Sequence, residues 1–234
     1  MEAQIAVAKI HKYATSNSGD TVEVIERPNG GLSVVLADGQ SSGKGAKTIS
    51  NMVVRKVIAL LAEGVRDGAA ARAASDYLLT ERSGKVSATL NIISLDQLTQ
   101  TMVITRNNPS PVYIADRDGI QVVDEPCKPI GVYRDTRPLI TEIPLESGLF
   151  VIIFSDGLEH AGKRYGEPMD IITCLQILLE DESPTPQFIA DSLLEQAVKL
   201  DDSRPADDIS VVVVGIIEDV GDEVRRMHVR LPLR

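Results

Sequence analysis

Tryptophan is absent from this sequence, and the other aromatic residues are scarce. Tyr and Phe together make up only 3% of the chain, so a hydrophobic core must be built mainly from Val, Ile, Leu and Ala. Cysteine is equally rare. Cys127 and Cys174 are far apart and belong to no paired motif, which argues against a disulfide framework and against a cysteine-based zinc site.

Basic residues are in the minority. The chain carries 24 Lys and Arg against 34 Asp and Glu, which gives a formal net charge of −10. A protein that binds duplex nucleic acid needs a basic face to neutralise phosphates, so we expect no nucleic-acid partner. A phosphorylated protein is still a compatible substrate, because bound metal ions reverse the charge inside a single cleft.

No apolar segment is long enough to cross a membrane. The longest runs are Leu149–Phe154 and Val211–Val214, which continues to Ile217, whereas a transmembrane helix needs about 20 apolar residues. The N-terminus lacks the basic and then apolar pattern of a signal peptide. We therefore expect a cytoplasmic protein with no membrane partner.

The apolar periodicity predicts strands and helices in separate groups. The expected strands are 21–27, 32–37, 86–95, 100–105, 112–115, 120–123, 139–143, 149–154 and 209–217. The expected helices are 46–63, 69–79, 169–180 and 187–200. Because no helix-length crossover separates the strands between 86 and 154, these strands must mostly pair antiparallel. The pattern indicates an α+β fold in which two antiparallel β-sheets pack as a sandwich flanked by helices.

Residues 1–217 are expected to form a single domain, because no segment rich in Pro, Gly and Ser divides them. In the remaining tail, 218–234, the apolar residues Met227, Val229, Leu231 and Leu233 alternate with mostly basic ones. This period of two predicts an edge strand laid on the sandwich. A partner-binding arm is the alternative.

Two of the four Asp-Gly pairs stand at the ends of apolar strands. The pair at Asp118 separates two short strands, as a hairpin turn does, and the pair at Asp67 joins two helices. Asp38 and Asp156 differ, because each follows a strongly apolar strand. Such a strand holds its carboxylate rigidly at a rim where a cleft can form.

Further carboxylates stand at the starts of strands. Asp20 precedes the first expected strand, and Asp207-Asp208 leads directly into the last. Strand ends of this kind, with no His or Cys pairs nearby, offer the oxygen ligands that hard cations take. Clustered carboxylates are unfavourable without cations to offset their charge. On spacing alone, the alternative that all are turn or capping residues stays open.

Several short motifs follow one another along the chain. They are Ser18-Gly19-Asp20, Ala37-Asp38-Gly39 with Gly43-Lys44-Gly45-Ala46, Ser87-Ala88-Thr89-Leu90, Pro129-Ile130-Gly131, Phe154-Ser155-Asp156-Gly157 and Asp207-Asp208-Ile209-Ser210. Their order and spacing resemble the PPM (type 2C) metal-dependent serine/threonine protein phosphatases, and more narrowly the bacterial SpoIIE/RsbX-like branch. The resemblance covers nearly the whole chain, from about residue 15 to residue 217.

The resemblance implies a PPM-type sandwich with two Mn²⁺ or Mg²⁺ ions at one edge. By position, Asp38 would bridge both ions. Asp20 and the backbone carbonyl of Gly39 would hold one ion, and Asp156 and Asp207 the other. Asp38 and Asp156 would then be catalytic, because two bridged ions lower the pKa of a shared water. That water would attack a phosphoserine or phosphothreonine in line.

Four further residues stand near these aspartates in the sequence. Asp208 is expected to support the site rather than to bind an ion. Lys44, at the start of the first long helix, either steers the substrate phosphate or is a solvated loop lysine. Gln40 stands where many eukaryotic relatives carry a His, and it cannot donate a proton as an acid. His160 either reaches the rim of the cleft or lies on the surface.

The sequence therefore predicts a metal-dependent serine/threonine protein phosphatase. By resemblance, its substrate would be a phosphorylated bacterial regulatory protein of the STAS type. One alternative is a catalytically weak regulatory binding protein with the same fold, against which the complete set of ligands argues. The other is a hydrolase for a small phosphate ester.

Overall fold

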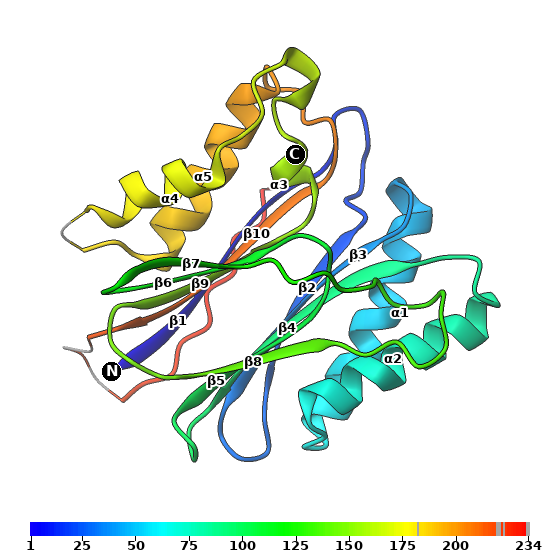
Figure 1. Ribbon diagram of the computed structural model, residues 1–234, viewed down its shortest axis with the longest axis horizontal. Helices are drawn as coiled ribbons and strands as arrows, with labels where there is room; N and C mark the ends of the chain where they lie inside the picture. Colours follow the sequence, from blue (N-terminus) through cyan, green and yellow to red (C-terminus); the bar gives the residue numbers. More distant parts are fainter. Residues whose placement is uncertain (182, 219–220, 222, 233–234) are drawn as a thin grey trace.

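The computed structural model of the protein describes residues 1–181, 183–218, 221 and 223–232 (Figure 1). Within these residues, two five-stranded sheets form, and all neighbouring strands pair antiparallel. The first sheet consists, in spatial order, of β1 (Glu2–Ile10), β10 (Ile209–Ile217), β9 (Leu149–Phe154), β6 (Val112–Asp116) and β7 (Gly119–Val123). The second consists of β2 (Asp20–Glu26), β3 (Leu32–Gly39), β4 (Ala88–Asp96), β5 (Thr101–Asn107) and β8 (Leu139–Pro144).

Helices cover the outer faces of both sheets (Figure 1). The second sheet is covered by α1 (Gly43–Ala62) and α2 (Asp67–Arg82), and the first by α4 (Ile171–Leu179) and α5 (Pro186–Leu200). A short helix, α3 (Gly157–His160), and a 3₁₀ turn (Lys163–Tyr165) follow β9. Among the described residues, no helix has the length and apolarity that a bilayer span requires. The predicted α+β sandwich is confirmed.

Three apolar cores hold the four layers together. In β3, Val34 and Leu36 belong to the core between the two sheets, whereas Val35 and Ala37 belong to the core shared with α1 and α2. All four side chains are buried. Because both faces of such a strand are covered, its sequence is continuously apolar rather than alternating. Each buried Val or Leu contributes about 1.5–3 kcal/mol relative to exposure.

The N-terminal strand β1 was not among the predicted elements. It pairs with β10 along its whole length, from Glu2 opposite Ile217 to Ile10 opposite Ile209. Its buried residues Ala6 and Ala8 are small and join the core of the first sheet and α5. Since β1 takes the position beside β10, it forms one edge of that sheet.

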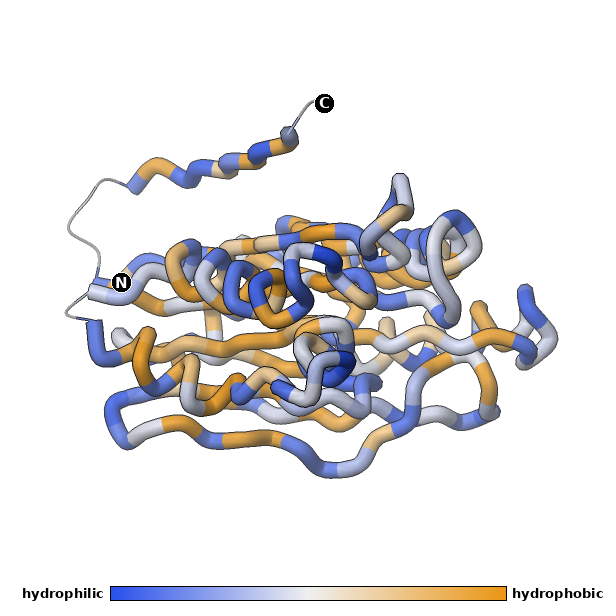
Figure 2. Tube along the Cα trace, turned by 90° about the horizontal axis from the view of Figure 1, so that it is seen from above, coloured by the Kyte–Doolittle hydropathy of each residue, from blue (hydrophilic) through white to orange (hydrophobic). Residues whose placement is uncertain are grey.

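The tail differs from the predicted edge strand. Residues 223–232 lie in no strand, while Leu233 falls outside the described residues. Figure 2 shows the tail as a separate segment beside the layers, with hydrophobic and hydrophilic residues in alternation. Val229 is 87% exposed. Arg225 contacts the Glu26 carboxylate at 3.2 Å and the Gly30 carbonyl oxygen at 3.1 Å. No apolar packing of the kind that an edge strand needs is therefore present in these residues.

Truncation after Glu218 is expected to change the melting temperature by less than about 4 °C. An exposed ion pair such as that of Arg225 contributes about 0–1 kcal/mol, and 1 kcal/mol shifts the Tm of a domain of this size by about 2–4 °C. Thermal unfolding followed by circular dichroism compares the truncated chain, Arg225→Ala and the full chain. A drop of about 10 °C or more would mean that the tail packs on the sandwich.

Candidate metal centre

One edge of the sandwich collects the aspartates from both sheets. Asp20 is the first residue of β2 and lies opposite Asp38, near the end of β3. Asp156 follows the end of β9, and Asp207 precedes the start of β10. Because β9 and β10 are antiparallel neighbours, the end of one and the start of the other lie at the same edge. The two pairs of carboxylates therefore face one another across the sandwich.

A cavity of about 530 Å³ opens at this edge. Three of the four aspartates, Asp38, Asp156 and Asp207, lie in its wall. The remaining lining residues are Lys12, Gly39, Gln40, Ser41, Ser42, Ser87, Ala88, Thr89 and Pro129. Asp20 is fully buried beside Asp38. The structure thus brings together the five residues expected to hold metal ions, Gly39 included.

The buried carboxylates are held together at a free-energy cost. Asp20 Oδ2 accepts a hydrogen bond from Ser210 Oγ at 2.6 Å, whereas Asp20 Oδ1 has no partner among the described residues. Burial, together with the charges of Asp20 and Asp156, raises the pKa of Asp38 to about 9. Burial also raises the pKa of Asp20 and of Asp156. A buried acceptor without a partner is unfavourable by about 1–3 kcal/mol.

These residues fit a divalent cation. A cation would satisfy the free oxygen of Asp20 and offset the repulsion that raises the pKa of Asp38. Asp156 and Asp207 offer donor oxygens within 4.8 Å of each other. Because the donors are carboxylates and a backbone carbonyl, the set suits hard ions such as Mg²⁺ and Mn²⁺.

The neighbouring residues Asp207 and Asp208 have different surroundings. Asp208 Oδ1 accepts a hydrogen bond from the Lys12 amide at 2.9 Å, and its Oδ2 accepts one from the Gly19 amide at 2.7 Å. Asp208 therefore fastens both ends of the loop between β1 and β2. Asp207 instead lines the cavity, and its Oδ1 accepts from the Asp208 amide at 3.0 Å.

Two lysines that the sequence analysis did not single out support Asp20. Lys9 Nζ and Lys47 Nζ both donate to the Asp20 carbonyl oxygen, at 2.6 and 2.7 Å. Burial and the nearby Lys47 lower the pKa of Lys9 to about 8. Lys9 lies on β1, in the first sheet, and Lys47 lies on α1, which covers the second sheet. Both layers are therefore bonded to the carbonyl oxygen of Asp20. If a strand had been predicted over 2–10, Lys9 would have stood near its end, and its position near the aspartates could have been expected.

Two glycines allow the elements at this edge to approach closely. A Cβ at Gly39 would overlap the carbonyl oxygen of Ala46, in the first turns of α1. A Cβ at Gly157 would overlap the carbonyl oxygen of Asp208. In both Asp-Gly pairs, glycine is therefore required by close packing rather than by a left-handed backbone.

Of the other residues considered from the sequence, Gln40 lines the cavity and Lys44 does not. Lys44 is exposed in the first turn of α1 and is not among the residues that line the cavity, whereas Lys12, which sequence patterns did not indicate, does line it. Gln40 is fixed to the residue before the neighbouring strand β4: its side-chain Oε1 accepts from the Ser87 backbone amide at 2.8 Å, and its own backbone amide donates to the Ser87 carbonyl at 3.0 Å. Gln40 thus closes one side of the cavity.

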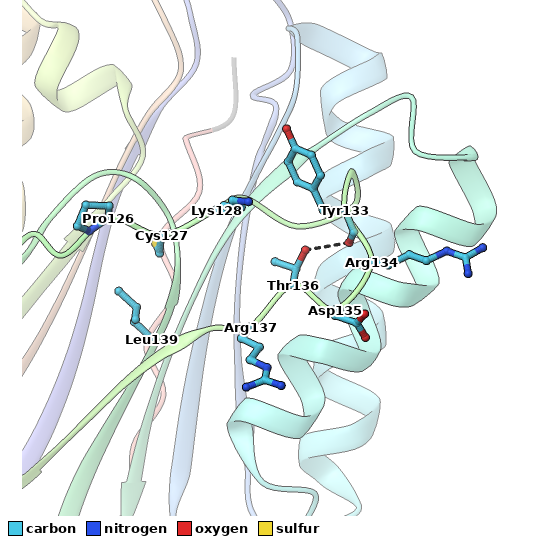
Figure 3. A pocket seen from close by; sticks show the side chains of 9 residues that line it. All are labelled: Pro126, Cys127, Lys128, Tyr133, Arg134, Asp135, Thr136, Arg137 and Leu139. Atoms are coloured by element: carbon cyan, nitrogen blue, oxygen red, sulfur yellow. Dashed lines mark hydrogen bonds between the residues drawn. The ribbon is translucent and has the colours of Figure 1, made fainter.

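A second cavity, of about 210 Å³, lies in the loop between β7 and β8 (Figure 3). Asp135 is the one acidic residue in its wall, and the Thr136 hydroxyl donates to the Tyr133 carbonyl at 2.9 Å. Figure 3 shows Arg134 and Arg137 pointing away from each other. This cavity lacks the cluster of carboxylates that a hard cation needs, so the larger cavity is the candidate metal centre.

Sequence comparison finds relatives of nearly the whole chain. The profile of the family described as Stage II sporulation protein E (SpoIIE) matches residues 28–217. Stage II sporulation protein E of Bacillus subtilis (strain 168) is 24% identical over 199 residues, which cover 85% of this chain and 24% of that protein. The chain spans about a quarter to a third of the length of the curated relatives that it matches.

Solved structures share the fold. The PP2C phosphatase domain of SpoIIE from Bacillus subtilis, solved with a fragment of its regulatory domain, has a TM-score of 0.81 at 22% identity, covering 94% of this chain and 64% of that one. The catalytic domain of the serine threonine protein phosphatase PstP, solved in complex with two manganese ions, has a TM-score of 0.70 at 17% identity, covering 92% and 99%. The sandwich is that of the PPM phosphatases.

Manganese is expected to raise the melting temperature. A ligand that binds only the native state at 100 times its Kd adds about 2.7 kcal/mol, which corresponds to about 5–10 °C for a chain of this size. Differential scanning calorimetry with MnCl₂ and with a chelator measures the shift. Identical curves for protein that is shown to be metal-free would contradict the assignment of the centre.

The manganese effect should depend on pH through Asp38. Its pKa is about 9 in the metal-free native state and about 4 in an unfolded chain. The metal-free protein therefore loses stability from this group as the pH rises from about 4 to about 9. The stabilisation by Mn²⁺ should grow over the same range, because fewer protons compete. Asp38→Asn should abolish the manganese shift without destabilising the metal-free protein, since it removes the repulsion.

Proposed function

The chain belongs to the SpoIIE family, and from this membership and the geometry of the cavity we propose that it is a metal-dependent phosphatase for phosphoserine and phosphothreonine in proteins. The observation that carries the proposal is the convergence of Asp38, Asp156 and Asp207, from two sheets, on one cavity. Asp20 is buried beside Asp38, and its Oδ1 has no partner among the described residues. Residues 1–217 form the catalytic domain in this proposal, because both the family match and β10 end at Ile217.

The carboxylates are assigned to two ions. Asp38 would hold both, since the charges of Asp20 on its own sheet and of Asp156 and Asp207 on the other all act on its carboxylate. Asp20 and the Gly39 carbonyl would complete one ion site, and Asp156 and Asp207 the other. When bound, two Mn²⁺ or Mg²⁺ ions supply a water of lowered pKa as the nucleophile and offset charge on the phosphoryl oxygens.

Residues of the chain itself perform the remaining tasks. Ser210, Lys9 and Lys47 hold Asp20 in place through its side chain and its carbonyl. Lys12 is the basic residue in the cavity wall, where it attracts the phosphoryl group and orients it toward the carboxylates. Gln40 has no proton to give as an acid. Its side-chain amide would therefore orient the serine or threonine oxygen that leaves, without protonating it.

Asp38→Asn and Asp156→Asn are each expected to lower turnover by at least about a hundredfold, because either change removes a charge that holds the ions. Hydrolysis of para-nitrophenyl phosphate at saturating Mn²⁺ measures the loss. Asp118→Asn is the matched control: it also alters an Asp-Gly pair, but in the exposed β6–β7 turn, and should retain wild-type turnover.

The outcome at saturating manganese separates the proposal from its alternative. If either variant keeps more than about a tenth of the wild-type rate, its assigned role is wrong. A wild-type protein that binds manganese without hydrolysing any phosphoester would instead be a regulatory binding protein with the phosphatase fold.

The proposed substrate is a phosphorylated regulatory protein of the STAS type, acted on in the cytoplasm. Its support is the membership of the SpoIIE family and the form of the site: the cavity opens at an edge of the sandwich, and the chain carries a net charge of −10 with no basic groove around the aspartates. Recognition then depends on contacts with a folded partner away from the ions. Free cysteines, Cys127 and Cys174, agree with a reducing compartment.

A phosphorylated STAS domain from the same organism should be hydrolysed with at least about tenfold higher kcat/KM than a peptide that carries the same phosphosite, because docking contacts are lost in the peptide. Steady-state phosphate release measures both, with a phosphotyrosine peptide as the control for substrate class. Equal efficiencies would remove the docking argument, and turnover of phosphotyrosine alone would overturn the substrate class.

A further inference from the structure

His160 lies beside two of the proposed ligands, although it is not among the residues that line the cavity. Donor atoms of Asp156, His160 and Asp207 all lie within 4.8 Å of one another. His160 Nδ1 is 3.9 Å from Asp156 Oδ2. Within the part of the chain that the structure describes, the carboxylate of Asp156 is the one ion-pair partner of this ring. The imidazole is therefore directed at the carboxylates and is not engaged elsewhere.

The backbone fixes the position of His160. Gly157, at the start of α3, packs against the carbonyl of Asp208 with no room for a Cβ. Leu158 is fully buried, and Glu159 accepts a short hydrogen bond from the Ser110 hydroxyl. Each residue of α3 before His160 is thus anchored, so the ring is presented toward the start of β10 by a rigid turn and not by a mobile loop.

The distances suit a shared ion. Two nitrogen or oxygen ligands at about 2.1 Å from one ion are at most about 4.2 Å apart, and the separation of 3.9 Å between His160 and Asp156 falls within that limit. Since no two of the three donor atoms are more than 4.8 Å apart, a movement of less than an ångström brings them within that limit. The side chains of His160 and Asp156 are 48% and 44% exposed, so they have room to make that movement.

We propose that His160 is a ligand of the ion held by Asp156 and Asp207, and that its imidazole biases this position toward Mn²⁺ over Mg²⁺. Imidazole binds transition-metal ions in preference to Mg²⁺, whereas carboxylates and carbonyls suit both Mn²⁺ and Mg²⁺. The ring must bind in its neutral form. This inference rests on the proposed metal centre, but it adds a nitrogen donor to a set that is otherwise all oxygen.

The competing interpretation is a simple ion pair. A protonated His160 beside Asp156 would form only a weak ion pair, because both side chains are nearly half exposed. It would also compete with the cation for the same carboxylate. The two interpretations therefore predict opposite effects of removing the ring: loss of manganese affinity if His160 is a ligand, and a gain if it is a competitor.

Pulsed electron paramagnetic resonance of bound Mn²⁺ tests the nitrogen donor directly. Wild-type protein should show nitrogen coupling that changes on labelling with ¹⁵N-histidine, and His160→Gln should lose it. The sequence contains three histidines, so the double variant His11→Gln/His228→Gln is the matched control and should keep the coupling. Titration should show that His160→Gln raises the Kd for Mn²⁺ by about tenfold or more, and the Kd for Mg²⁺ by clearly less.

Two results would overturn the inference. One is bound Mn²⁺ without histidine nitrogen coupling in the wild type, and the other is unchanged or tighter Mn²⁺ binding by His160→Gln. If para-nitrophenyl phosphate is still hydrolysed in either case, the proposed function stands and only the role of His160 fails. A wild type that binds no Mn²⁺ and hydrolyses no phosphoester would remove both.

Discussion

The opposition of Asp20 and Asp38 across two neighbouring strands is the constraint on which the rest of the site depends. The buried carboxylate of Asp20 and the half-buried carboxylate of Asp38 repel each other, and the surrounding residues offset part of this repulsion. Ser210 from β10 bonds the side chain of Asp20, while Lys9 and Lys47 bond its carbonyl. One oxygen is still left without a partner among the described residues. The protein thus holds the two carboxylates in place, and a bound cation would supply the partner that the free oxygen of Asp20 lacks.

Sequence patterns predicted the strongly apolar strands, and the reason is physical. The central strands β3, β9 and β10 are covered on both faces, so they read as continuous apolar runs with an aspartate at one end. Asp38 and Asp156 stood out for that reason. The strand β1 did not, because its buried positions are the small residues Ala6 and Ala8, which mark a strand only weakly.

The family resemblance assigned Asp208 a supporting role, but the contacts through which it supports the site were beyond the reach of the sequence. Asp207 and Asp208 are adjacent, and only the fold reveals that Asp208 is occupied by the amides of Lys12 and Gly19. Lys12 itself lies in a loop without periodicity, so no pattern placed it at the cavity. The tail shows the reverse error. Its alternation resembles a strand, yet alternation alone provides no neighbour to pair with, and β1 already occupies the place beside β10.

The bond between Gly19 and Asp208 joins residues 189 positions apart, and this separation matters while the protein is being made. Synthesis proceeds from the N-terminus at about 5–20 residues per second. The β2–β3 hairpin with Asp20 and Asp38 therefore leaves the ribosome many seconds before Ser210, whose hydroxyl bonds Asp20, has been added. During that interval the paired carboxylates have only part of their support. β10, the last of the described strands in chain order, thus completes the centre, so a nascent chain that lacks β10 has no assembled metal centre.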